Sequence, residues 1–306
     1  MSVTAADRER RLPARTSGAS LSPHVFTPAE INRRVDELLT ADLSNVRNCV
    51  LELVFHFVAL TETTLFAYVR KQVAISENID TFTRRLRQYR ADGLLTSVSQ
   101  DALKSVKRAG LQEARCAHLR AYHLGPVGEE YVKRKGWNGN VPIASVTESV
   151  LVHDLICAET MLHMSELWLY HPSSPGVVEV RGPREVLVWD AEKKAAVIAP
   201  DGLLIKRSKE GVFERAFLVE YQNVRALLQV QNKLKKYDTI ANPENRWVWD
   251  AWGLEAMPYV LVVPRQGSTL KHYQEEITGR GEMAARFASI ALEDVWAGNL
   301  SIKLIK

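Results

Sequence analysis

The sequence contains little cysteine, with three in 306 residues at Cys49, Cys116 and Cys157. No two of them form a Cys-x-x-Cys pair, so their spacing argues against zinc-finger sites and against a disulfide framework. Sparse, unpaired cysteine is typical of proteins in a reducing compartment. We therefore expect a cytoplasmic location.

Long hydrophobic runs are also lacking. The most apolar stretch, Cys49–Leu60, is shorter than the ~20 residues that a membrane-spanning helix needs, and it contains Glu52 and His56. The N-terminus has no apolar segment of the secretory type. We expect no membrane partner. Residues 1–28 are rich in Arg, Ser, Ala and Pro with little periodicity, which predicts a disordered tail.

The overall composition is that of an ordinary globular protein, 46% hydrophobic and 25% charged, with length for one large or two modest domains. The basic charge is unevenly distributed. Residues 80–137 carry a net charge of +6, whereas the whole chain carries +4, so the remainder is slightly acidic. Such localisation indicates a surface for a polyanion. We expect a basic domain over residues 29–140 and a second domain over residues 141–306.

The pattern of the basic domain predicts a winged helix-turn-helix. Apolar residues have helical spacing over Asn45–Val58, a short helix follows at Leu65–Val69, and a basic helix spans Ser76–Asp92. An extended segment then begins at Leu94, and Ala117–Leu124 is expected as the returning wing strand. The basic helix would be the recognition helix in the major groove. The predicted DNA contacts are Arg84, Arg85, Arg87 and Arg90 on this helix, with Lys104, Lys107 and Arg108 after it.

Two alternatives remain open for this basic helix. It could be an exposed helix with no role in nucleic-acid binding, and winged helices also mediate contacts between proteins. We favour DNA because the positive charge is concentrated as phosphate contacts require.

The second domain alternates between helices and strands, which predicts an α/β sandwich with a mixed central sheet, and hence an α+β chain overall. The continuous apolar run Pro258–Pro264 is typical of a strand buried on both faces. The expected elements are a long helix at 145–170, strands at 185–190, 195–206 and 215–222, a crossover helix at 224–240, the buried strand, a mostly helical segment at 267–298 and an edge strand at 300–305.

Acidic residues stand at two positions of the predicted hairpin. Pro200-Asp201-Gly202 interrupts its first strand, and Glu220 and Gln222, two residues apart, share one face at the end of its second strand. Carboxylate and amide oxygens are ligands for Mg²⁺, so we expect Mg²⁺ or Mn²⁺ at this place. The predicted metal ligands are Asp201, Glu220 and, from the long helix, Glu166, with Glu159 as an alternative that spacing does not exclude. Pro-Asp-Gly is equally ordinary turn chemistry.

This order of elements is also that of the PD-(D/E)xK nuclease superfamily, whose acidic residues sit on the second and third strands, as Asp201 and Glu220 do. The resemblance implies a restriction-endonuclease-like fold. The third position of the motif is normally lysine, and this chain has Gln222 there. Lys206, Lys233 or Lys235 would have to supply the missing positive charge. The candidate catalytic residues are therefore Asp201, Glu220, Gln222, Lys206 and Lys233.

The combination of both domains resembles the replication-relaxation family of plasmid and mobile-element proteins, from about Asn45 to Pro264. The motifs that carry the resemblance are Asp92–Leu95, Tyr122–Gly128, His153–Leu155, Pro200–Gly202, the strand around Glu220, and Lys233–Tyr237. The resemblance implies DNA handling on a mobile element, in replication, mobilisation, relaxation or transcriptional control. The expected partners are double-stranded DNA and other mobile-element proteins. A homodimer is expected from the winged-helix class.

Three functions follow from these patterns. The first is a DNA-binding protein with a Mg²⁺-dependent endonuclease domain. The second is a non-catalytic regulator or accessory factor that uses a degenerate nuclease fold for dimerisation or DNA clamping. The third is a pure protein-interaction module, suggested by tryptophans such as those in Trp247-Val-Trp249-Asp-Ala-Trp252.

Overall fold

A computed structural model of the chain describes most of the sequence after residue 24. The tail predicted over residues 1–28 lies almost wholly outside this description, as does most of the predicted domain boundary at 142–147. The described ranges are 25–41, 43–108, 120–137, 147–171, 175–190, 192, 195–222, 227–264, 267–278 and 280–305.

The sequence Thr27-Pro28-Ala29-Glu30 predicts a helix start, with threonine as the N-cap, proline in the first turn and glutamate three residues after the cap. Helix α1 (Pro28–Thr40) begins there. Thr27 is the N-cap, and its side chain accepts a hydrogen bond from the backbone N–H of Glu30 at 3.3 Å. Glu30 in turn accepts one from the backbone N–H of Thr27 at 2.9 Å. This reciprocal pair satisfies two N–H groups that have no partner within the helix.

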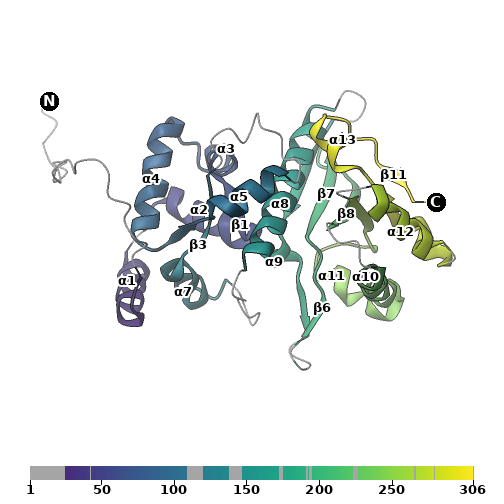
Figure 1. Cartoon of the computed structure of the whole chain (residues 1–306), viewed down its shortest axis with the longest axis horizontal. Coiled ribbons are helices and arrows are strands. Elements are labelled where there is room, and N and C mark those ends of the chain that lie inside the picture. The colour runs from purple at the N-terminus through teal and green to yellow at the C-terminus, as the bar shows by residue number, and fades with distance from the viewer. Residues whose placement is uncertain are drawn as a thin grey trace, which may run out of the picture.

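The rest of the N-terminal half contains helices around a small antiparallel sheet of order β1-β3-β2 (Figure 1). The three helices predicted between residues 45 and 92 are present. The sequence from Gly125 to Lys135 also predicts a helix, and α7 is found there. The elements are α2 (Asn45–Phe57), β1 (Ala59–Thr61), α3 (Glu62–Val73), α4 (Ile79–Ala91), β2 (Leu95–Ser97), α5 (Gln100–Arg108), β3 (Ala121–Leu124) and α7 (Pro126–Arg134).

Helix α5 corrects the expectation of a plain β-hairpin between β2 and β3. It buries Ala102, Leu103 and Val106 on one side and packs against α8 of the second half. The spacing of three and four residues between these apolar positions is helical, so the sequence pattern itself favours a helix over a hairpin here. Lys104, Lys107 and Arg108 therefore lie on a helix rather than on a β wing.

The motifs Asp92–Leu95 and Tyr122–Gly128, both of which contain glycine, contact each other. Gly93 follows α4 with a φ of +78°, a conformation that suits glycine. Its carbonyl accepts a hydrogen bond from Val127 N at 3.0 Å, and that of Leu94 accepts one from Gly125 N at 2.9 Å. A Cβ on Gly128 would lie 2.2 Å from the Leu94 carbonyl oxygen. The motifs around residues 93 and 125–128 thus fasten the end of α4 to the start of α7.

Within the described ranges, the C-terminal half is built on a six-stranded sheet of order β11-β10-β9-β8-β7-β4. Strand β9 runs parallel to β8 and β10, and the other neighbours are antiparallel, so the sheet is mixed, as predicted. The strands are β4 (Gly176–Arg181), β7 (Gly202–Ser208), β8 (Phe213–Gln222), β9 (Tyr259–Pro264), β10 (Phe287–Ser289) and β11 (Lys303–Leu304).

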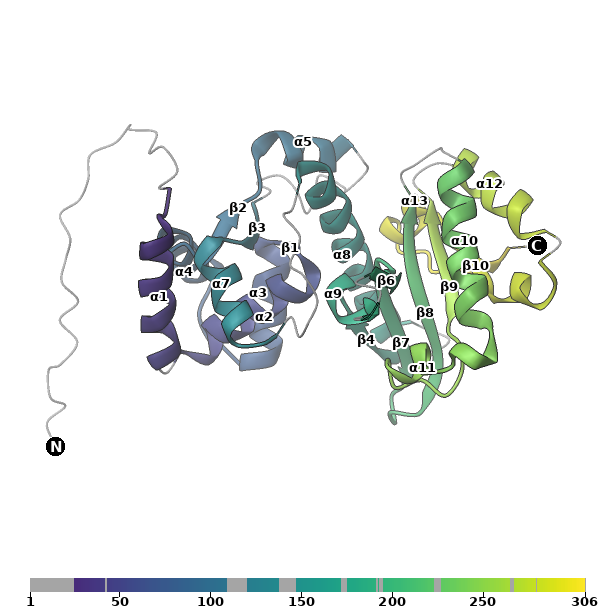
Figure 2. The same ribbon diagram turned by 90° about the horizontal axis from the view of Figure 1, so that it is seen from below.

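Helices cover both faces of this sheet (Figures 1 and 2). Helix α8 (Glu148–Leu169) lies between the sheet and the N-terminal half, whereas α10 (Leu227–Ala241) and α12 (Gly267–Ile277) lie on the opposite face. The remaining short elements are α9 (Pro183–Val186), β5 (Val188–Asp190), β6 (Ala195–Ile198), η1 (Pro243–Asn245), α11 (Trp247–Asp250), η2 (Gly281–Arg286) and α13 (Leu292–Trp296).

The strand predicted over 195–206 is in fact two strands. Strand β6 pairs with β5 in a separate two-stranded sheet, and β7 begins only at Gly202. Pro200, between them, has no N–H to donate to a ladder, which explains the break. The strand predicted at 185–190 is helix α9 followed by β5. Strand β4 was missed because its side chains are mostly half-buried at a sheet edge, and β10 was missed inside the segment predicted to be helical.

Helix α8 is buried on every side in its middle, since residues 155–162 are all inaccessible to solvent. A helix that is buried all round must pack against neighbours on each face. One apolar cluster includes residues of the N-terminal helices, of α8 and of the central sheet. The two predicted domains therefore share one continuous core.

Two charged side chains from the C-terminal half form hydrogen bonds at the ends of helices in the N-terminal half. Glu159 on α8, only 3% exposed, accepts hydrogen bonds from Thr61 N at 3.0 Å and the Thr64 hydroxyl at 2.6 Å, at the N-terminus of α3. Arg184 on α9 donates to the Phe55 carbonyl at 3.2 Å, at the C-terminus of α2. Both charges have the sign that the helix dipole favours.

In the described part of the chain, no helix has the length and apolar character needed to span a bilayer.

We predict that Glu159→Gln lowers the free energy of unfolding by about 1–3 kcal/mol, because a charged acceptor in a buried position is replaced by an amide that cannot accept on both atoms. Chemical denaturation measures the change. Glu166→Gln, on the same helix but with a side chain that is 31% exposed and lies 3.9 Å from Lys71, is the matched control and should change stability by less than ~0.5 kcal/mol. Equal effects of the two substitutions would contradict the role given to Glu159.

Candidate functional site

Asp201 and Glu220 face each other across the β7–β8 hairpin. Gly202 is paired with Val219, and Asp201 N donates a hydrogen bond to the Val219 carbonyl at 3.0 Å. One step beyond that pair, Asp201 lies opposite Glu220. The hairpin thus brings together the two acidic residues that the sequence singles out.

The Asp201 carboxylate is held from β8 and from α8. Its Oδ2 accepts a hydrogen bond from Tyr221 N at 2.8 Å, and His153 Nε2 lies 3.5 Å from the same oxygen. The other ring nitrogen of His153, Nδ1, lies 3.1 Å from Asp154 Oδ1. His153 is therefore placed between two carboxylates, Asp201 and Asp154.

Glu220 is 2% exposed, and its carboxylate points towards α10. Lys233 Nζ contacts Oε2, and the Tyr237 hydroxyl donates to Oε1. Lys233 and Tyr237 are four residues apart, which places them one turn apart on the same side of the helix. Each oxygen of the buried carboxylate therefore has a partner from α10.

Charges within the site shift its pKa values. Burial by itself would lower the pKa of His153, but the negative charge of Asp201 and the hydrogen bond with Asp154 raise it to about 9. Burial raises the pKa of Glu220, and the charge of Asp201 raises it further, against the effect of Lys233. Burial opposes the charged form of Lys233, but Glu220 and Asp201 outweigh it and raise the pKa of Lys233. His153 and Lys233 are thus both cations at neutral pH, one beside each carboxylate.

A cavity of about 280 Å³ opens beside Glu220, Lys233 and Tyr237. Lys236 and Asn232 from α10 also line it, so a ligand entering there meets a second lysine. Tyr273 on α12 lies close enough to Glu220 to interact with its charge: burial raises the pKa of Tyr273, and the negative charge of Glu220 raises it further. Tyr237 and Tyr273 were not among the predicted site residues. The motif Lys233–Tyr237 contained the signal for Tyr237, and nothing in the sequence indicated Tyr273.

The other predicted catalytic residues differ in position. Gln222 is buried at the end of β8, two residues after Glu220 and therefore on the same face of the strand. Lys206 pairs with Glu214 at 2.8 Å, five residues along β7 from Asp201 and so ~17 Å away. Of the lysines considered for the missing motif position, Lys233 is the one that contacts Glu220.

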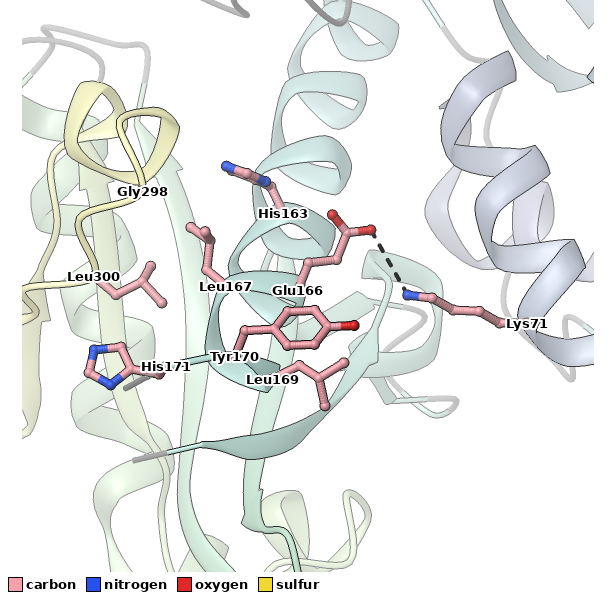
Figure 3. Close-up of a pocket in the computed structure, with 9 residues that line it drawn as sticks. All are labelled: Lys71, His163, Glu166, Leu167, Leu169, Tyr170, His171, Gly298 and Leu300. Carbon is pink, nitrogen blue, oxygen red and sulfur yellow. Dashed lines mark ion pairs between the residues drawn. The ribbon is translucent and has the colours of Figure 1, made fainter. Parts of the chain in front are cut away.

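Glu166, the predicted third metal ligand, lies elsewhere. It follows His153 by thirteen residues on α8, a separation of ~20 Å along the helix. Figure 3 shows Glu166 paired with Lys71 at the edge of a different cavity, of about 510 Å³. The alternative, Glu159, is engaged at the N-terminus of α3. Neither glutamate of the long helix joins Asp201 and Glu220.

No cluster of three or more His, Cys, Asp or Glu side chains suited to hold a metal ion is found within the described ranges. Asp201 and Glu220 offer carboxylate oxygens, the donor type that Mg²⁺ prefers. Because Asp201 raises the pKa of Glu220, the two negative charges oppose each other. The pair therefore fits a hard divalent ion in donor type, whereas Lys233 and His153 already place a positive charge beside each carboxylate.

The four arginines of α4 are all exposed: Arg84 and Arg87 lie opposite the side that buries Phe82, Leu86 and Tyr89, and Arg85 and Arg90 flank that side. Arg85 pairs with Glu77 at 2.8 Å, and Arg90 donates to the Ser97 hydroxyl at 3.3 Å. The amphipathic pattern therefore presents Arg84, Arg85, Arg87 and Arg90 to solvent. On α5, Lys104 is exposed and pairs with Asp101 at 2.9 Å, and the side chains of Lys107 and Arg108 lie outside the description.

The tryptophan group proposed for protein contacts is mainly part of the core. Trp249 and Trp252 are buried, and the Trp252 indole N–H donates to the Val186 carbonyl at 3.0 Å. Trp247 is the exposed member. Core packing accounts for two of the three residues.

Comparisons with protein-family models, with curated proteins and with solved structures found no match to this chain.

We predict that raising the pH destabilises the protein through His153. Its pKa is about 9 in the folded protein, against 6.5 for an unperturbed histidine. The stabilising contribution is complete below pH ~6.5 and is lost as the pH rises through ~9, amounting to about 1–3 kcal/mol. Urea denaturation at pH 6 and pH 9.5 measures the loss, with His153→Gln as the reference. An identical pH dependence in that variant would contradict the prediction.

Proposed function

We propose that the chain is a DNA-binding protein with an N-terminal winged helix-turn-helix and a C-terminal PD-(D/E)xK nuclease fold. In support, the N-terminal elements from α2 onwards follow one another as helix, strand, two helices, strand, helix and strand, with α4 as the arginine-bearing helix and α5 inserted between the last two strands. The core elements of the C-terminal half follow as helix, three antiparallel strands, crossover helix and parallel strand, namely α8, β4, β7, β8, α10 and β9, with α9, β5 and β6 inserted between β4 and β7.

For the C-terminal half we propose metal-dependent hydrolysis of DNA. The observation that carries this proposal is the convergence of Asp201, Glu220 and Lys233 at one end of the β7–β8 hairpin. Asp201 and Glu220 would hold Mg²⁺ or Mn²⁺. When bound, such an ion supplies activation of water and stabilisation of charge on the leaving oxygen.

The protein side chains have separable roles in this proposal. Lys233 replaces the lysine that the motif lacks at Gln222, and it places a positive charge where a phosphate would carry negative charge. Tyr237 orients the Glu220 carboxylate from the same turn of α10. His153 orients the Asp201 carboxylate from α8. Gln222 supplies an amide on the same strand face as Glu220.

We expect the protein to nick or linearise supercoiled plasmid in Mg²⁺ or Mn²⁺, and Asp201→Asn with Glu220→Gln to abolish this. Lys233→Met should lower the rate by about 100-fold or more, the usual loss for a group that stabilises developing charge. Agarose gels of plasmid over time measure the rates.

Lys235→Met is the matched control, because Lys235 is an exposed lysine of the same helix that contacts neither carboxylate. It should cleave like the unaltered protein. Cleavage that survives the double substitution would mean that Asp201 and Glu220 are not the reacting site.

A non-catalytic regulator or accessory factor is the second candidate. The favouring observation is that Glu220 is already paired with Lys233 and Tyr237, and Asp201 with His153. In that case these pairs stabilise the fold around the hairpin and take no part in a reaction. Binding of intact DNA, without cleavage in either metal, would select this function.

For the N-terminal half, we expect Arg87→Ala to weaken binding to duplex DNA. Loss of one phosphate contact should also reduce the slope of the logarithm of the binding constant against the logarithm of the salt concentration by about one. Fluorescence anisotropy over a salt series measures both. Arg33→Ala, an exposed arginine on α1, is the control and should change neither. An unchanged slope for Arg87→Ala would place the DNA surface elsewhere.

We further propose, from the motif resemblance, that this DNA belongs to a plasmid or other mobile element. A homodimer and other mobile-element proteins are the corresponding partners.

A further inference from the structure

A cavity of about 420 Å³ lies at the opposite end of the central sheet from Asp201 and Glu220. Its lining includes residues at the start of β8 and β9 and the segment just before β9. Arg215, one of its residues, precedes Glu220 by five positions on β8, which separates the two sites by ~17 Å. The volume lies in the range of about 300–1,000 Å³ that is usual for small-molecule sites.

Three arginines line this cavity. Arg286 is held in place, since it donates to the Met257 carbonyl at 3.1 Å and its guanidinium lies 5.8 Å from the ring centre of Tyr259. Arg207 lies 3.8 Å from Glu179. Arg215 is exposed and forms no ion pair with any residue that the structure describes. Guanidinium groups arranged around one cavity favour phosphate or carboxylate ligands.

Two glutamates also line the cavity, and they do not cancel this charge. Glu214 is paired with Lys206 at 2.8 Å, so its negative charge is already neutralised. Glu255 is exposed at the rim. The balance of the lining remains positive.

An exposed aromatic ring adjoins the arginines. Phe213 is 52% exposed, an unusual position for a phenylalanine, and it lines the cavity together with Tyr259. In the ladder, the backbone position of Phe213 is paired with that of Arg207 on the adjacent strand, and both residues line the cavity. An open aromatic face beside cations is the arrangement on which nucleobases stack.

From these contacts we propose that the cavity binds a nucleoside phosphate, with Arg215 and Arg286 on the phosphate and Phe213 against the base. The site goes beyond the proposed nuclease and does not use its carboxylates. The same chemistry is presented by a free nucleotide and by the 5′-phosphorylated end of a single strand, so the test includes both.

Isothermal titration calorimetry with the full chain tests the proposal. The probes are deoxyadenosine 5′-monophosphate, a 5′-phosphorylated hexadeoxynucleotide, deoxyadenosine and inorganic phosphate. We expect the two phosphorylated nucleotide probes to bind more tightly than deoxyadenosine. Arg215→Ala should weaken them by about 10- to 100-fold. Phe213→Ala should weaken deoxyadenosine monophosphate by about tenfold and leave inorganic phosphate unchanged.

Binding of the oligonucleotide alone would identify a strand end as the ligand, and binding of both would identify the nucleotide itself. Arg33→Ala is the charge-matched control and should bind like the unaltered protein. The double variant Asp201→Asn, Glu220→Gln should also bind normally, which separates this site from the proposed nuclease. The proposal is overturned if neither nucleotide binds, or if Arg215→Ala and Arg33→Ala behave alike.

Discussion

Two charged side chains of the C-terminal half, the buried Glu159 and the half-buried Arg184, form hydrogen bonds with helix ends of the N-terminal half and so connect the two halves. Glu159 lies at the N-terminus of α3 and Arg184 at the C-terminus of α2, and β1 runs between those helix ends. A buried carboxylate without these donors would be costly, so the contact specifies how the halves meet. Because α8 carries both Glu159 and His153, the same helix fixes the N-terminal helices and the Asp201 carboxylate.

The carboxylate site shows how burial and pairing oppose each other. Glu220 is almost fully buried, which raises its pKa, whereas the contact with Lys233 acts in the opposite direction. Such a pair contributes little net stability over an apolar pair of the same size, yet loss of one partner is expensive. Stability alone therefore does not account for a lysine and a glutamate at these positions.

The sequence predicted the elements whose signals are local and regular. Thr27 and Glu30 identified the start of α1, and the apolar run before Pro264 identified β9. It also indicated that Asp201 and Glu220 would be neighbours, because a short hairpin fixes which residues face each other. It did not show β4, because the side chains of this edge strand are mostly half-buried and do not alternate clearly. The helical spacing of Ala102, Leu103 and Val106 does indicate α5, although a hairpin was expected there. Spacing along α8 could not reveal that Glu159 and Glu166 serve other contacts, or that Lys233 rather than Lys206 reaches Glu220, because the partners lie on other elements.

The middle of α8, buried on every side, also bears on how such a chain can arise and be divided. A linker between independent domains can be cut or extended with little penalty, but α8 belongs to the cores of both halves. Removal of either half would expose a continuous apolar flank along several helical turns, and the remaining fragment would tend to aggregate. Recombination that exchanged one half would therefore have to remodel this helix at the same time. The two halves share one apolar core, although the secondary-structure pattern of each is typical of a separate domain.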